Sequence, residues 1–162
     1  MHKRLVWPVP IALAILLSGC SVTVTMLGPL APDSLVGYQL ELINSERGGP
    51  LEAGDPVFDV ESRVAYLFPA ENSALNLTLT DRNNEFLSSD SMSYSRSGST
   101  GTVEITFRIN LNVDFIVTCK LRFTDSVSGT HRCEFEERER GTMELNTIES
   151  GWGEGTFELE KP

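Results

Sequence analysis

The sequence of 162 residues predicts an all-β domain, a single antiparallel up-and-down meander of about eight or nine strands that forms a closed or nearly closed small barrel. Three observations lead to this prediction. Apolar and polar residues alternate over one long stretch, and turn-forming residues separate several shorter alternating stretches. No stretch of helical length carries apolar residues at the helical spacing of about 3.6. Closure into a barrel would remove the exposed strand edges of an open sheet.

Short alternating stretches predict strands on both sides of the longest one. They lie at 36–42, 62–68, 75–79, 85–95, 130–135, 143–148 and 151–159. Turn-forming residues at 81–84 separate 75–79 from 85–95, and those at 97–101 separate 85–95 from the longest stretch. Because successive side chains of a strand point to opposite faces, each stretch is expected to place one set inward and the other in water.

The longest alternating stretch runs from Val103 to Phe123, where every odd position is apolar and every even position except Ile116 is polar. This length exceeds that of an ordinary strand, so we expect a turn near 110–112 and two antiparallel strands. Turn chemistry at 124–129 then predicts a second hairpin, after which the alternation resumes.

Two cysteines belong to the inward-facing set of this hairpin. Cys119 and Cys133 lie symmetrically about Ser126, so adjacent antiparallel strands would place them opposite each other and within reach of a disulfide. The bond would close a short loop and contribute about 3 kcal/mol in the chain-entropy account. The alternative is a pair of buried free thiols, and a bulge of one residue in the turn would prevent the pairing.

The charge balance is acidic, with 13 basic and 23 acidic side chains and a net charge of −10. Removal of residues 1–19 would take away Lys3 and Arg4 and leave a net charge of −12. Nucleic-acid binding requires a basic surface, so the composition argues against a nucleic-acid partner. It also argues against an electrostatic grip on anionic lipid.

Catalytic patterns are missing from the sequence. His131 is the one histidine after residue 19, and we expect it in the core or lining the barrel. No Gly-x-Ser-x-Gly motif accompanies it, and a histidine-based zinc site would need more ligands. The acidic stretch at 81–85 lacks the ligand spacing and the glycine of a calcium loop. The sequence therefore predicts a protein that is not an enzyme and that uses no metal and no cofactor.

The N-terminus combines a basic start at Lys3 and Arg4 with an apolar stretch at 9–17 and ends in Leu17-Ser18-Gly19-Cys20. This arrangement resembles a bacterial lipoprotein signal with its lipobox, whose cysteine is acylated, with palmitate for example, and becomes the first residue of the processed chain. An ordinary cleaved signal would end in an Ala-x-Ala-like site, and a spanning helix needs about 20 apolar residues.

The resemblance implies a signal peptide at 1–19, an acylated cysteine with a flexible tether at 20–34, and the barrel domain at 35–162. It also implies a lipid-anchored protein of the cell envelope. In the Gram-negative pattern, Asp after the lipidated cysteine retains a lipoprotein in the inner membrane. Ser21 stands there in this chain, which favours the periplasmic face of the outer membrane.

The predicted domain is also similar to the calycin or lipocalin-like group of small barrels. The similarity lies in the opening Gly37-Tyr38-Gln39-Leu40, the meander through Phe123 and the closing stretch at 155–159. Lipocalins begin with Gly-x-Trp, whereas this chain has Gln39 at the tryptophan position. The resemblance implies a small apolar ligand or a lipid inside the barrel. The candidate lining residues are Tyr38, Tyr66, Phe68, Phe107, Phe115 and Trp152, with a plain core role as the alternative.

Two functions follow from these patterns. The first is a lipid-anchored envelope protein whose barrel binds a small apolar ligand or lipid. The alternative is a non-catalytic structural or accessory lipoprotein that docks an envelope protein through its outer surface. The charge run at 134–140 is expected to be the solvated end of a hairpin, with a docking patch for a basic partner as the alternative.

Overall fold

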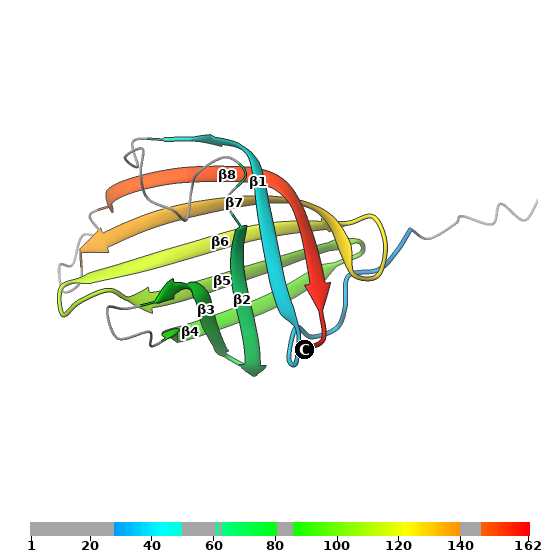
Figure 1. The fold of residues 1–162 in the computed structure, drawn as a ribbon, viewed down its shortest axis with the longest axis horizontal. Coiled ribbons are helices and arrows are strands. Elements are labelled where there is room, and N and C mark those ends of the chain that lie inside the picture. The colour runs from blue at the N-terminus through cyan, green and yellow to red at the C-terminus, as the bar shows by residue number, and fades with distance from the viewer. Residues whose placement is uncertain (1–27, 50–60, 62, 81–85, 140–146) are drawn as a thin grey trace, which may run out of the picture.

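The computed structural model describes residues 28–49, 61, 63–80, 86–139 and 147–162, so the predicted signal peptide and Cys20 lie outside the described residues. Eight antiparallel strands follow one another around a closed barrel, and the described parts of the chain contain no helix (Figure 1). The strands are β1 (Gln39–Gly48), β2 (Arg63–Ala70), β3 (Ser73–Thr80), β4 (Phe86–Ser97), β5 (Thr100–Arg108), β6 (Val113–Phe123), β7 (Ser128–Glu139) and β8 (Thr147–Glu160).

The predicted fold class is confirmed. Each strand pairs with the next along the chain, and β8 pairs with β1 to close the barrel. The long alternating stretch divides at 109–112 into β5 and β6, and the turn at 124–127 separates β6 from β7. The stretches at 143–148 and 151–159 were expected to form two separate strands. The structure instead has one strand, β8, that runs without a break from Thr147 to Glu160.

The described part of the charge run, 134–139, is the last part of β7 and pairs with the beginning of β8, so it lies at the end of the β7–β8 hairpin as expected. Residues Glu134 to Glu139 continue β7, where their backbone groups pair with β6 and β8. The side chains of Glu136 and Arg138 form an ion pair on the surface. The run is therefore part of a wall of the barrel.

Side chains from all eight strands fill the interior. The inward positions follow the alternation of the sequence, as β5 and β6 show with a buried residue at every second position. The largest fully buried side chains are Tyr66, Phe68, Phe107, Phe135, Phe157, Leu35, Leu40, Leu42, Ile105, Leu121 and Val64. Burial of these apolar surfaces is the main contribution to the stability of the barrel.

Part of the predicted tether packs against the barrel. The segment from Gly28 to Tyr38 runs across the end where β6 turns into β7 and where the chain terminates (Figure 1). Ala31 and Leu35 are buried in the core cluster, and the Tyr94 hydroxyl donates a hydrogen bond of 2.9 Å to the Pro32 carbonyl. The barrel domain therefore includes residues that the sequence assigns to the tether at 20–34.

Candidate functional site

Four of the six predicted lining residues are packed core. Tyr66, Phe68 and Phe107 have no accessible surface, and Phe115 is 5% exposed. A side chain without accessible surface touches no space large enough for a water molecule. The ring centroids of Tyr66 and Phe107 lie 6.1 Å apart in a stacked arrangement, which places the two rings in the same close-packed interior. The middle of the barrel is filled by the protein's own side chains.

The other two predicted lining residues lie elsewhere. Tyr38 is half-buried at the end of the barrel, where the Lys161 ammonium lies 4.8 Å from its ring centroid. Trp152 lies on the outer face of β8, and the Arg132 guanidinium lies 4.4 Å from its ring centroid. Trp152 therefore does not face the interior. Its inward-facing neighbour on β8 is Gly153, which is buried and pairs with Cys133.

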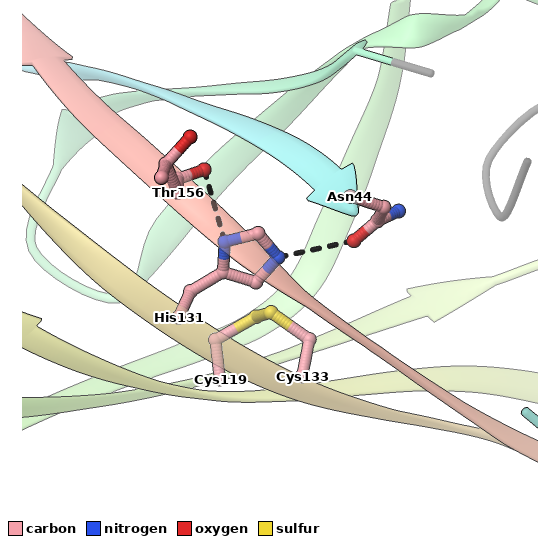
Figure 2. Close-up of a disulfide and its surroundings, with 5 residues drawn as sticks. All are labelled: Asn44, Cys119, His131, Cys133 and Thr156. Carbon is pink, nitrogen blue, oxygen red and sulfur yellow. Dashed lines mark hydrogen bonds between the residues drawn. A yellow bond between two sulfur atoms is a disulfide. The ribbon is translucent and has the colours of Figure 1, made fainter. Parts of the chain in front are cut away.

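Cys119 and Cys133 form the predicted disulfide. They are directly opposite each other in the pairing of β6 with β7, and their Cα atoms lie 4.0 Å apart. Both side chains point into the barrel, as the alternation requires, and Figure 2 shows the bond beside the His131 ring. The uninterrupted register of the hairpin makes the pairing possible, because a one-residue shift would turn one of the cysteines outward.

His131 lies in the barrel interior and connects three strands. Its Nδ1 atom lies 3.0 Å from the Thr156 carbonyl oxygen on β8, and its Nε2 atom lies 3.0 Å from Asn44 Oδ1 on β1 (Figure 2). His131 itself belongs to β7. The ring therefore bridges β7 and β1 across the intervening strand β8.

Glycines on β8 make room for this bridge. A Cβ atom at Gly153 would lie 2.6 Å from Asn44 Oδ1, and a Cβ atom at Gly155 would lie 2.0 Å from the Ile43 carbonyl oxygen. Both contacts are much shorter than ordinary van der Waals distances. The glycine-rich part of β8 leaves the space above the strand to Asn44 and His131, and this is why two polar side chains can meet over it.

Burial lowers the pKa of His131, while the bond to Thr156 and the charge of Glu154 oppose the shift. A neutral ring has one N–H donor and one acceptor nitrogen. Nδ1 donates to the Thr156 carbonyl, so Nε2 must accept. A half-turn of the Asn44 amide brings Nδ2 to Nε2 and also gives a partner to this buried amide nitrogen, which otherwise has none among the described residues. The states with a neutral and with a protonated His131 therefore differ in the orientation of the Asn44 amide.

This arrangement does not suit catalysis. Both ring nitrogens of His131 bond to groups of the protein and the ring is buried, so a substrate in solution does not reach either nitrogen. In the described part of the chain, no three His, Cys, Asp or Glu side chains come together in a way that could hold a metal ion. The geometry supports a structural role for His131 as a cross-brace.

The outer wall of the barrel carries a shallow concavity of about 530 Å³ that the sequence analysis did not identify. The side chains around it are mostly polar and include three cations. The lining residues are Ser45, Thr100, Lys120, Arg122, Thr130, His131, Arg132, Glu154 and Gly155, and we call this surface the basic groove. Arg132 bonds to Glu154 at 2.7 Å, whereas Lys120 and Arg122 form no ion pair with any described residue. The sequence does contain a signal for this surface, because cations stand at even, outward-facing positions of β6 and β7.

A comparison of the chain with family models, with curated proteins and with solved structures finds no match. Within the ranges that the structure describes, there is no helix of the length and apolar character needed to cross a bilayer. The site must therefore be interpreted from its own geometry and chemistry.

Proposed function

We propose that this protein is a lipid-anchored accessory protein of the bacterial envelope, whose filled barrel presents its outer wall to a protein partner. Acylation at Cys20 and a position on the periplasmic face of the outer membrane are parts of this proposal. The observation that supports it is the packing of the interior, because the predicted lining residues Tyr66, Phe68 and Phe107 leave no accessible space beside them. This favours the outer surface over the interior as the place of recognition.

The basic groove is the part of the outer wall that we assign to the partner. The chain carries a net charge of −10, so two cations without carboxylate partners in the described residues are unusual on its surface. Lys120 and Arg122 lie on β6 and point to the same outer face, where Thr130 of β7 lies opposite Arg122. Charge complementarity favours an acidic segment of an envelope protein as the occupant.

Site-specific photo-crosslinking in the envelope tests this proposal. A photoreactive residue replaces Thr130 in the basic groove or, as the control, the exposed Ser88 on the opposite wall. We expect a discrete cross-linked protein from position 130 and none from position 88. The substitution Lys120→Glu should abolish the cross-link, whereas Lys161→Glu, which changes the charge equally outside the groove, should leave it intact.

Two outcomes would contradict the proposal. Equal cross-linking from both positions, or a cross-link that survives Lys120→Glu, would show that the basic groove does not hold the partner. Native mass spectrometry of the gently purified protein gives the second outcome. A stoichiometric small apolar adduct would support the lipid-binding function that the sequence analysis put first and would count against a filled barrel.

A further inference from the structure

One end of the barrel is where the chain enters the domain. The Ala31 N–H donates a hydrogen bond of 3.0 Å to the Gly98 carbonyl, and the Tyr94 hydroxyl binds the Pro32 carbonyl at 2.9 Å. These bonds hold the segment 28–38 against β4 and the turn that joins β4 to β5. We call the end formed by this segment and by the turns 71–72, 98–99 and 124–127 the anchor rim.

The length of chain before the anchor rim limits how the barrel can stand on a membrane. Seven residues, Ser21 to Leu27, separate Cys20 from Gly28, and fully extended they span at most about 29 Å. The eleven residues of β6 are about 36 Å long, which a strand tilt of about 40° reduces to about 28 Å along the barrel axis. A barrel standing on its opposite end would therefore need the whole segment at full extension.

Exposed apolar side chains mark the two ends of the barrel. At the anchor rim, Leu30, Val36 and Val127 are 53%, 39% and 44% exposed. At the opposite end, the turn between β5 and β6 exposes Ile109 by 49% and Leu111 by 86%. Apolar side chains close to a bilayer can enter its interfacial region, which adds to the binding of a lipid anchor.

Charges at the anchor rim limit how closely it approaches anionic lipid. The exposed carboxylates in or next to the anchor rim are those of Asp33, Glu71, Asp125 and Glu160, and the exposed cations there are those of Arg96, Arg122 and Lys161. Asp33 and Arg96 form an ion pair, which leaves an excess of negative charge. Repulsion from anionic headgroups therefore opposes the apolar contact, and salt weakens this repulsion.

We infer that the anchor rim faces the lipid bilayer, with Leu30, Val36 and Val127 at the headgroup region, while the turn between β5 and β6 points away from the membrane. This inference rests on the proposed function, because it requires acyl chains on Cys20. It places the basic groove, which lies on the side wall, where a partner beside the barrel can reach it.

Fluorescence quenching by labelled lipid tests the orientation. With Cys20 acylated and Cys119 bonded to Cys133, a new cysteine is the one free thiol of the processed chain and takes a fluorophore selectively. Full-length acylated Val127→Cys, Leu30→Cys and Leu111→Cys are reconstituted into vesicles of phosphatidylethanolamine and phosphatidylglycerol that contain a nitroxide-headgroup lipid. We expect several-fold stronger quenching at 127 and at 30 than at 111, and a further increase at 127 in high salt.

The outcomes separate the orientation from the anchor. Equal quenching at all three positions, or stronger quenching at 111, on a protein with acyl mass on Cys20 would overturn the orientation and leave the anchor in place. A purified protein without acyl mass that does not bind the vesicles would overturn both proposals. All three substitutions are at exposed positions, and an unchanged thermal transition of each variant confirms that the barrel is intact.

Discussion

The strands β5 to β8 and the strands β2 to β4 close the same barrel with different regularity. Each residue of β5 from Thr100 to Arg108 has a partner on β6, and β6 pairs with β7 without interruption. In contrast, the pairing of β2 with β3 shifts after Leu67, and that of β3 with β4 shifts after Asn76. An interrupted ladder opens locally at a lower free-energy cost, so β2 to β4 are expected to open first.

The groups that connect strands follow the same division. The disulfide joins β6 to β7, and the His131 bridge extends from β7 to β1. Phe123 packs edge to face against Phe157, which links β6 to β8. In β2, by contrast, the buried Tyr66 hydroxyl has no hydrogen-bond partner among the described residues. The comparison indicates that β5 to β8 form a strongly connected wall and that the less regularly paired strands β2 to β4 complete the barrel.

Removal of the disulfide should have the largest effect, and it acts on β5 to β8. The double variant C119A/C133A loses the constraint on a loop of about 15 residues, so we expect a decrease of about 3 kcal/mol in the free energy of unfolding. Urea denaturation measures the change. Hydrogen exchange should show the protection of β6 and β7 falling toward that of β2 to β4. A variant as stable as the parent protein would show that this bond does not stabilise β5 to β8.

A methyl group at Gly155 should disturb the closure of the barrel. A Cβ atom there would lie 2.0 Å from the Ile43 carbonyl oxygen, which is backbone and cannot move aside alone. We expect Gly155→Ala to lower the free energy of unfolding by about 1–3 kcal/mol, as overpacking does. Thr156→Ala, at the adjacent exposed position, is the matched control for urea denaturation. Equal stability of the two variants would show that β1 and β8 tolerate a side chain at this position.

The sequence was most informative where the pattern was local. The alternation from Val103 to Phe123 was long enough to predict β5, β6 and the turn between them, and with the alternation that resumes at 130–135 it placed Cys119 and Cys133 on the same inner face. It could not predict that Asn44 meets His131, because that contact depends on the closure of β1 against β8.

Trp152 shows a second limit of the sequence pattern. An aromatic residue in a strand suggests an inward position, but in β8 the inward positions 151, 153 and 155 are glycines. Glycine carries no hydrophobic signal, so the alternation did not show which face was buried. The space above Gly153 is filled by the Asn44 side chain and that above Gly155 by the backbone of β1, and that arrangement is visible only in three dimensions.

The His131 bridge should make stability depend on pH. Burial lowers the pKa of His131 in the folded protein below the ordinary value of 6.5. Between the folded pKa and 6.5, the His131 side chain therefore binds a proton in the unfolded chain but not in the folded one. Stability is therefore fully present above about pH 6.5 and decreases as the pH falls toward the folded pKa. In His131→Gln this dependence should disappear, which urea denaturation at several pH values measures. The same slope in both proteins would contradict the shift.

The smallest effect is expected in the less regularly paired strands β2 to β4. The Tyr66 hydroxyl is fully buried and has no hydrogen-bond partner in the part of the chain that the structure describes, and the same burial raises the pKa of this group far above its ordinary value. Desolvation of the hydroxyl is therefore not compensated, and Tyr66→Phe keeps the ring stacked on Phe107 while it removes this cost.

We expect Tyr66→Phe to raise the free energy of unfolding by about 1 kcal/mol, because an unsatisfied buried group carries a penalty of about this size or more. The control is Tyr38→Phe, at a half-exposed ring that keeps contact with water, where we expect no gain. A loss of stability in Tyr66→Phe would mean that the hydroxyl has a partner in solution, such as a buried water molecule. The interior next to β2 would then hold a satisfied polar group, as it does at the His131 bridge. The contrast between β2 to β4 and β5 to β8 would be limited to the regularity of their strand pairing.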